Sequence, residues 1–261
     1  MILPEITLLE LESVDSTNAY AKQHFESFVD GTLVTAEMQT DGRGRLGRNW
    51  FSPPGVNIYA SLVMKQIANP FYATITGSLA ALKLLQEQLP RESFFIKWPN
   101  DIYVERKKIC GILSECHTSR SGIDGVITGI GININLETEE LAGIGQPAAS
   151  LKSLSGKFFD VRKLTFLLAD ALAEYYAVYL HSPEKLFAEW KENNFVIGKL
   201  VGLVDSNGNR KSVKVLDISE TGELITEENG CISRFNCGDV TLMKESFPEG
   251  VLPRNGFFSI K

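Results

Sequence analysis

The chain has 261 residues, 44% of them hydrophobic, and a formal net charge of −6 at pH 7. This length allows one large buried core, or one core plus a smaller domain, and the acidic balance argues against a general nucleic-acid binder, which usually has a basic face. No apolar run reaches membrane-spanning length and no signal peptide is visible, so the sequence predicts a soluble, cytoplasmic protein.

The first predicted elements are a short strand over residues 6–12 and a helix over residues 19–25. The residues between them, 13–18, are rich in Ser, Thr, Asp and Asn. Such side chains cap helices, because their oxygens accept hydrogen bonds from the free N–H groups of the first turn. A second strand, over residues 32–36, leads to Gln39, whose amide both donates and accepts hydrogen bonds.

An unusual stretch follows at residues 42–48, which contain three arginines and three glycines. Glycine lets the main chain come close to a ligand, and the forked donors of arginine suit phosphate or carboxylate. The stretch therefore predicts an anion-binding loop, with a flexible basic surface loop as the alternative. The glycines also fit the dinucleotide fingerprint G-x-G-x-x-G, but two prolines and a glycine at residues 53–55 exclude the helix which that motif needs. We expect a long loop between two strands.

The middle of the chain is predicted to alternate strands and helices. A strand ends at Trp98, because Pro99 breaks it and places Asn100 and Asp101 at a turn. Glycine, isoleucine and asparagine alternate over residues 129–135, which puts the apolar and the polar side chains on opposite faces of a strand. The other predictions are strands over 56–64, 109–116 and 126–135, turns over 105–108 and 119–124, a loop over 136–145, and helices over 70–88, 160–180 and 183–193.

From residue 199 onward the pattern becomes β-rich and predicts a small all-β domain with turns at residues 207–209 and 229–230. The short strands are expected over 201–204, 212–216, 224–226 and 239–242. The four cysteines show no zinc-binding spacing, and we expect all four to be reduced packing residues. Cys110 and Cys116 lie on one predicted strand, too far apart to pair. Cys231 and Cys237 could lie closer if a turn separates them.

Five motifs in this order resemble those of the biotin protein ligases, which attach biotin to a lysine of the biotin carboxyl carrier protein. They are Ser-Thr-Asn at 16–18, the loop region at 39–61, Lys-Trp-Pro-Asn-Asp at 97–101, and the runs 108–115 and 129–135. The resemblance implies an α+β fold for residues 1–195, with a mixed β-sheet packed against helices as in class II synthetases. It further implies a small SH3-like β-barrel over residues 196–243, with 244–261 as an unassigned tail.

The resemblance also implies a chemistry: ATP converts biotin to biotinyl-AMP, the carrier lysine then takes the biotinyl group, and Mg²⁺ screens the leaving pyrophosphate. The resemblance assigns catalytic roles to Lys108, Arg43, Arg45 and Asp101, and it makes Asp101 the metal ligand as well. The lysine of the family motif matches Lys108 and not Lys107, because of its interval from Asp101. Biotin is expected beside Ser16, Thr17, Asn18, Gln39, Arg43, Gly44, Arg45, Lys108 and Gly111, and ATP beside Arg45, Arg48, Trp50, Asn100, Asp101, Lys108 and Asn133.

The expected partners are the carrier protein, biotin and ATP, with no nucleic acid or membrane, and a homodimer is left open. Because Ser16 lies so near residue 1, we expect no helix-turn-helix domain before it and no repressor role. Three alternatives stay open: a lipoate or octanoyl ligase or transferase, a biotin sensor without catalysis, and a nucleic-acid-binding module that uses the arginine loop.

Overall fold

The computed structural model describes residues 3–67, 69–204, 208–236 and 239–243. The chain divides into two compact units, one formed by residues 1–96 and 100–193 and the other by residues 97–99 and 194–261. Each unit is described by itself. None of the described helices is long and apolar enough to cross a bilayer.

The first unit is built on a seven-stranded mixed sheet with the strand order β1-β2-β3-β7-β6-β5-β4. Strands β1 and β2 are parallel, whereas β2–β3, β3–β7, β7–β6 and β6–β5 are antiparallel pairs. The strands are β1 (Thr7–Val14), β2 (Thr32–Gln39), β3 (Ile58–Met64), β4 (Phe94–Lys97), β5 (Asp101–Val104), β6 (Lys107–Ser119) and β7 (Gly122–Ile132).

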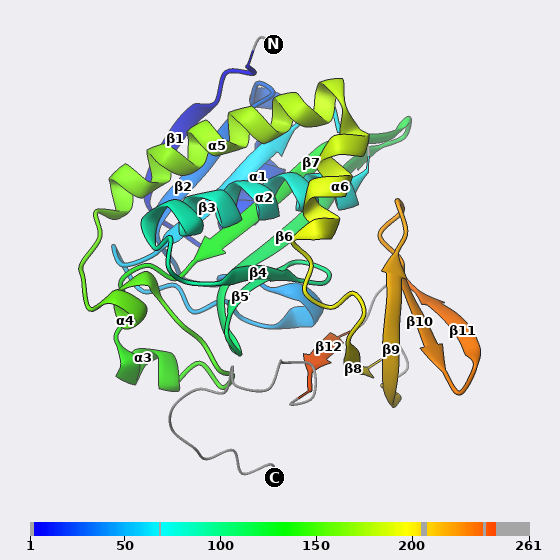
Figure 1. Cartoon of the computed structure of the whole chain (residues 1–261). Helices are drawn as coiled ribbons and strands as arrows, with labels where there is room; N and C mark the ends of the chain where they lie inside the picture. The colour runs from blue at the N-terminus through cyan, green and yellow to red at the C-terminus, as the bar shows by residue number, and fades with distance from the viewer. Residues whose placement is uncertain (1–2, 68, 205–207, 237–238, 244–261) are drawn as a thin grey trace. The chain divides into compact units, whose positions relative to one another are not determined.

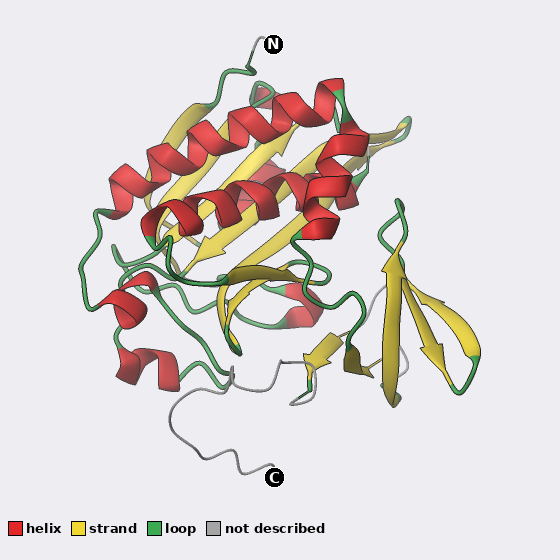
Figure 2. Cartoon of the chain, in the orientation of Figure 1, coloured by secondary structure: helices red, strands yellow, loops and turns green. Residues whose placement is uncertain are grey.

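Helices cover both faces of this sheet. Helices α2 (Pro70–Gln88), α5 (Val161–His181) and α6 (Pro183–Glu192) lie on one face, and α1 (Thr17–Gln23) lies on the other (Figures 1 and 2). The two long helices are present where the sequence predicts them. Asn69 caps α2 ahead of Pro70, and Asp160 accepts a hydrogen bond from the Lys163 N–H at the start of α5.

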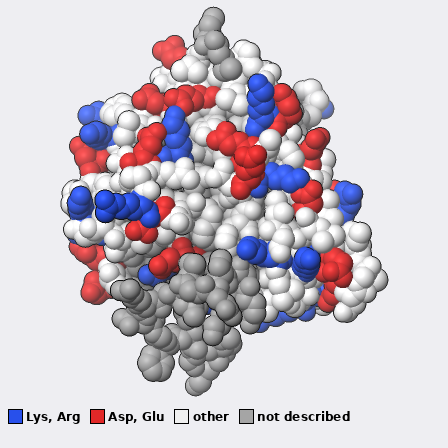
Figure 3. Space-filling model, viewed as in Figure 1, with Lys and Arg blue, Asp and Glu red and all other residues white. Residues whose placement is uncertain are grey.

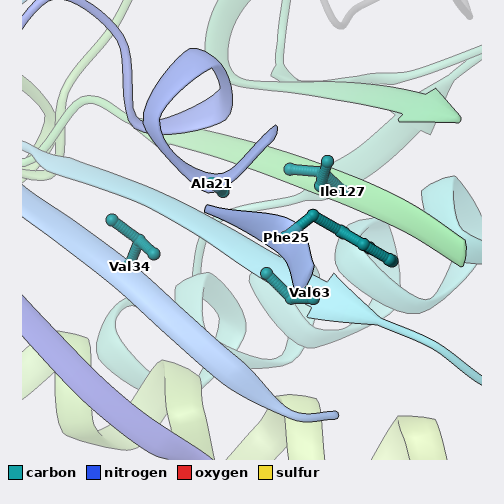
Figure 4. Packing of buried hydrophobic residues seen from close by; sticks show 5 residues of the cluster. All are labelled: Ala21, Phe25, Val34, Val63 and Ile127. Carbon is teal, nitrogen blue, oxygen red and sulfur yellow. The ribbon is translucent and has the colours of Figure 1, made fainter. Parts of the chain in front are cut away.

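A small hydrophobic cluster holds α1 against the sheet. Ala21 of α1 and Phe25 just after it pack on Val34, Val63 and Ile127, one residue from each of β2, β3 and β7 (Figure 4). All five side chains are buried. Because this cluster fixes the helix, it also fixes the three polar residues at the N-terminus of α1 over the middle of the sheet.

The second unit contains a five-stranded antiparallel sheet with the order β11-β10-β9-β8-β12. Its strands are β8 (Leu200–Val204), β9 (Arg210–Ile218), β10 (Leu224–Glu228), β11 (Cys231–Phe235) and β12 (Asp239–Leu242). Trp98 is completely buried in this unit and donates from Nε1 to the Gly222 carbonyl at 3.0 Å. The described strands form an open sheet, so the small β domain is present but the described residues do not close it into a barrel.

Most predicted elements are present, and the differences are local. The expected loop over 136–145 contains a one-turn helix, α3 (Thr138–Ala142), which Glu137 and Glu140 begin as a capping box. Strand β11 was not predicted, because its side chains are almost all exposed and carry no alternating pattern. Strand β7 ends at Ile132, so Asn133 and Asn135 follow the strand. Short α4 (Leu151–Ser155) was also not predicted.

The cysteines agree only in part with the expectation of reduced packing residues. Cys110, Cys116 and Cys231 are free thiols. Cys110 is buried and Cys116 half-buried on β6, but Cys231 is exposed, so the prediction that it packs in a core is wrong. Cys237 and the tail 244–261 lie outside the described residues.

Candidate functional site

The predicted site residues of the first unit gather on the face of the sheet that carries α1. Alternate residues of β7 point to opposite faces: Thr128 and Ile130 face Gly77 of α2, whereas Gly129 and Gly131 face Asn18 and Trp50. The site is therefore built from the start of α1, the loop after β2, and the central strands β3, β6 and β7.

Thr17 and Gln39 form a hydrogen-bonded group, and Ser16 precedes Thr17 at the start of α1. The backbone N–H and the hydroxyl of Thr17 both donate to Gln39 Oε1, at 2.9 and 3.1 Å, and Gln39 Nε2 donates to Ser52 Oγ at 2.9 Å. Ser16 is the N-cap of α1, since its Oγ accepts from the Ala19 N–H. The capping interpretation is confirmed for Ser16, and its side chain is buried.

Ser61 and Glu115, which are not among the predicted site residues, complete this network. Ser61 Oγ on β3 lies 2.8 Å from Thr17 Oγ1 and 2.6 Å from Asn18 Oδ1. Asn18 Nδ2 donates to the Leu113 carbonyl at 3.0 Å and to Glu115 Oε2 at 2.8 Å. A serine inside the otherwise apolar strand 58–64 was the available signal, because a buried hydroxyl needs a partner.

The charged part of the site is a close ion pair. Lys108 Nζ on β6 lies 2.7 Å from Asp101 Oδ1 on β5, and only 15% and 14% of the two side chains are exposed. The same Nζ lies 5.2 Å from the centre of the Trp50 ring, within reach of a cation–π interaction. A β-bulge between Ile102 and Tyr103 shifts the register of β5 against β6 at this point. The Lys108 ammonium is therefore turned away from bulk solvent, toward Asp101 and Trp50.

The arginine-rich stretch is a loop, as predicted, and its three arginines have different surroundings. Arg45 Nη1 donates to Asn100 Oδ1 at 3.0 Å, which brings the loop to the turn beside Asp101. Arg43 is exposed and pairs with Asp41 at 3.1 Å, so the structure does not bring Arg43 together with Lys108. Arg48 is exposed and close to Tyr103, whose pKa burial and Asp101 raise and Arg48 lowers.

Glycines on β6 and β7 make room for these side chains. A Cβ atom at Gly131 would lie 2.5 Å from the Trp50 indole, and one at Gly111 would lie 3.0 Å from both Trp50 and Lys108 Nζ. A Cβ atom at Gly129 would lie 2.4 Å from Asn18 Oδ1. The indole of Trp50 thus lies over Gly111 and Gly131, and the side chain of Asn18 lies over Gly129. Its buried Nε1 has no acceptor among the described residues.

Two asparagines predicted in the ATP site have structural bonds of their own. Asn133 is buried and donates from Nδ2 to the Ala149 carbonyl at 3.0 Å. Asn100 donates from Nδ2 to the Ile112 carbonyl at 2.6 Å while its Oδ1 accepts from Arg45. Both residues therefore fix the shape of the region beside Lys108. Gly44 precedes the 3-10 turn Arg45–Gly47, and its N–H donates to the Arg48 carbonyl at 2.7 Å.

A magnesium ion would find one carboxylate here, that of Asp101. Mg²⁺ usually keeps several waters and takes only one or two carboxylates together with substrate phosphates. Asp101 fits such an ion when triphosphate oxygens supply the other ligands. Within the described ranges, the one group of three metal-ligating side chains is Glu26, His117 and Asp124, and Asp101 does not belong to it.

Comparison with known proteins gives a consistent picture. Residues 10–133 match the biotin/lipoate A/B protein ligase family. The chain is 34% identical over 175 residues to the biotin–[acetyl-CoA-carboxylase] ligase of Paracoccus denitrificans, covering 64% of this chain and 72% of that protein. It is 28% identical over 237 residues to the bifunctional ligase/repressor BirA of Escherichia coli, covering 89% of this chain. Across four such ligase/repressors it spans between 66% and 73% of their length.

A solved structure agrees with this result. The biotin protein ligase from Aquifex aeolicus in complex with biotin and ATP superposes with a TM-score of 0.75 and 27% identity. The match covers 90% of this chain and 97% of that one.

Proposed function

This chain belongs to the biotin protein ligases of the biotin/lipoate A/B protein ligase family, and on that premise we propose the following reaction. The protein uses ATP to convert biotin to biotinyl-AMP and passes the biotinyl group to a lysine of the biotin carboxyl carrier protein. The observation that carries the proposal is the half-buried Lys108–Asp101 pair. It lies beside the Trp50 ring and the Arg45–Asn100 contact, on the same sheet face as the Thr17–Gln39 group.

In the first half-reaction, a carboxylate oxygen of biotin attacks the α-phosphorus of ATP. The new P–O bond forms as the bond to the β-phosphate oxygen breaks, and pyrophosphate leaves. Negative charge gathers on the phosphate oxygens, so fixed cations aimed at them lower the barrier. Lys108 is the cation best placed for this role, and Arg45 reaches the same region through Asn100. Arg43 would add a further positive charge beside the phosphate if its guanidinium left Asp41 and bound the ligand instead.

In the second half-reaction, the neutral amine of the carrier lysine attacks the carbonyl carbon of the mixed anhydride. An amide bond forms, AMP leaves with the electron pair of the broken C–O bond, and the nitrogen loses a proton to solvent or phosphate. Lys108 would again offset charge on the carbonyl and the phosphate. The carboxylate is already activated, so no covalent intermediate with the enzyme is needed.

The ring end of biotin carries a urea, with one carbonyl acceptor and two N–H donors. Among the described residues, three groups retain hydrogen-bonding capacity toward such a ring. Two belong to the network, the second Nε2 hydrogen of Gln39 and a lone pair of Thr17 Oγ1. The third is the hydroxyl proton of Ser16, which precedes Thr17 in the chain and uses its oxygen to cap α1. Two donors and one acceptor match a neutral urea better than they match a carboxylate or a phosphate. This favours biotin over lipoate or octanoate, which have no urea.

Mg²⁺ is part of the proposal, with Asp101 as its protein ligand. When bound, the ion would neutralise charge on the leaving pyrophosphate.

The carrier protein as partner, a location in the cytoplasm and the formation of a homodimer stay predictions. On the face shown in Figure 3, Lys and Arg side chains are interspersed with Asp and Glu. A continuous basic surface of the kind that binds nucleic acid is not visible on that face.

The direct test incubates the purified chain with ATP, Mg²⁺, a biotin carboxyl carrier domain and either biotin, lipoate or octanoate. Mass spectrometry of the carrier should show one added biotinyl group, which requires ATP, and no lipoyl or octanoyl adduct. A carrier with its target lysine replaced by arginine is the control. Labelling by lipoate in preference to biotin would assign the chain to a different branch of the family. Biotin binding without labelling would favour the sensor alternative.

A further inference from the structure

We infer that Ser61 is a positioning residue for the biotin ring: its buried hydroxyl orients Thr17 and sets how many hydrogen bonds Thr17 can accept from the ligand. The inference rests on the proposed function and adds a determinant of biotin affinity in the middle of the sheet. Ser61 belongs to β3, far along the chain from both residues it contacts.

The geometry singles out this serine. Ser61 is completely buried, in a strand whose seven residues are all buried and otherwise apolar. A buried hydroxyl often bonds to the backbone of its own element, as Ser78 does with the Thr74 carbonyl in α2. Ser61 instead reaches two consecutive side chains of the ligand site, Thr17 and Asn18, at 2.8 and 2.6 Å.

The neighbouring strand leaves space for this contact. Ser61 is paired with Gly129 of β7 in the antiparallel register. A Cβ atom at Gly129 would come within 2.4 Å of Asn18 Oδ1. The serine and the glycine therefore act together, because one bonds the Asn18 amide and the other leaves room for it.

The single hydroxyl proton of Ser61 determines how many hydrogen bonds Thr17 can accept from the ligand. A serine hydroxyl has one proton, whereas Ser61 has two acceptors within reach, Thr17 Oγ1 and Asn18 Oδ1. Thr17 gives its own proton to Gln39 Oε1. When Ser61 donates to Asn18, both lone pairs of Thr17 Oγ1 can accept from an N–H of the ligand. When Ser61 donates to Thr17, that hydrogen bond occupies one of the two lone pairs. Ser61 can therefore switch acceptors as the ring binds, without any movement of the backbone.

The test is Ser61→Ala, measured by steady-state kinetics and by direct calorimetric binding of biotin. Removal of one neutral hydrogen bond that holds Thr17 should raise both the KM and the Kd for biotin roughly fivefold. The KM for ATP and kcat should change less than about twofold, since Lys108 and Asp101 do not contact Ser61. Ser61→Cys keeps the size and a weak donor, so it should recover part of the affinity.

Ser78→Ala is the matched control, because it also removes a completely buried hydroxyl but on the opposite face of the sheet. It should leave the KM for biotin at the wild-type value. Thr17→Val combined with Ser61→Ala should weaken biotin binding no more than Thr17→Val alone.

The inference is overturned if Ser61→Ala behaves like Ser78→Ala, or if it raises the KM values for biotin and ATP in parallel. Should Ser61→Ala unfold, Ser61→Gly, which also removes the hydroxyl, has the same consequence if its KM for biotin is unchanged. A wild-type chain that binds no biotin overturns the proposed function instead, so the two failures are distinguishable.

Discussion

Two adjacent lysines on β6 illustrate how a strand separates a site residue from a surface residue. Successive side chains point to opposite faces. Lys107 is exposed, whereas Lys108 is half-buried and lies 2.7 Å from Asp101. The resemblance selects Lys108 over Lys107, and the geometry gives a physical reason for this choice. A cation with a carboxylate partner and an aromatic neighbour has a defined position, which electrostatic stabilisation of a transition state needs.

We predict that Lys108→Ala loses adenylate formation but keeps its fold. Removing one preorganised charge from a phosphoryl-transfer site typically lowers the rate on the order of 10² to 10³-fold. Biotin-dependent exchange of pyrophosphate into ATP measures this step. The substitution also removes the ion pair between Lys108 and Asp101, so we expect the melting temperature to fall by a few degrees.

Lys107→Ala is the matched control, since it removes an identical charge one residue away. It should exchange pyrophosphate at the wild-type rate. A Lys108→Ala protein with near-normal exchange would remove Lys108 from the mechanism.

At the scale of elements, the glycines of β6 and β7 decide which side chains can lie flat on the sheet. Gly131 and Gly111 are positions where any Cβ atom meets the indole of Trp50. Trp50 itself comes from the loop between β2 and β3. A loop residue thus forms part of the floor of the site, because two strands omit their side chains beneath it.

Gly131→Ala should therefore displace Trp50. An indole ring is rigid and cannot make room by rotating a terminal atom, so we expect the whole ring to shift. The overpacking should lower the free energy of unfolding by about 1 to 3 kcal/mol. A misplaced group of this kind should lower adenylate formation on the order of 10-fold or more. Tryptophan fluorescence should change, because Trp98 and Trp190 are buried elsewhere.

The matched control is Gly202→Ala on β8, a strand glycine whose nearest neighbour would lie 3.6 Å from an added Cβ atom. It should leave activity unchanged. Wild-type fluorescence and pyrophosphate exchange in Gly131→Ala would contradict the role given to the glycine and to Trp50.

The arginine loop, residues 40–54, is the element that we expect to close over the ligand. It contains a left-handed Leu46, with φ of 57°, whose side chain is 71% exposed. Among the described residues, the guanidinium of Arg43 pairs with the exposed Asp41, an interaction that contributes little. Such a loop reorders easily when an anion offers better partners.

Limited trypsin digestion tests this expectation, because cleavage after Arg43, Arg45 or Arg48 can be mapped by mass spectrometry. Biotin plus ATP should protect these bonds, and ATP alone should protect them less. The Lys108→Ala protein, which we expect to form little adenylate, provides the second comparison. Equal cleavage under all conditions would mean that the loop does not close.

At the scale of the whole molecule, buried tyrosines determine the response to alkaline pH. Burial raises the pKa of Tyr59, Tyr103 and Tyr176 above the ordinary value of 10.0. The folded protein therefore keeps these protons after the unfolded chain has lost them. Their contribution to stability is complete below pH 10 and decreases as the pH rises toward the folded pKa values.

We predict that the melting temperature falls steeply above pH 10. Tyrosinate absorbance of the buried residues should appear together with loss of the near-ultraviolet dichroism, because ionisation requires unfolding. Tyr59→Phe removes one of these groups and should make the fall less steep. Ionisation of all seven tyrosines with native dichroism retained would show that burial does not control their titration.

The sequence by itself determined the features that depend on neighbours along the chain. Helix α2 follows from the Asn69 cap, Pro70 and a regular apolar face, and the arginine loop from glycines that no regular element tolerates. Lys108, Gln39 and Thr17 were identified because their motifs are local and ordered.

The tertiary structure decided the contacts between residues distant in sequence. Only the folding of the sheet brings Ser61 to Thr17 and Asn18, places Trp50 over Gly131, and pairs Lys108 with Asp101 across a β-bulge while Arg43 pairs with Asp41. The physical reason is that a hydrogen bond or an ion pair acts over about 3 Å. Residues that meet at that distance leave no periodic trace in a sequence when strand pairing, and not chain order, makes them neighbours.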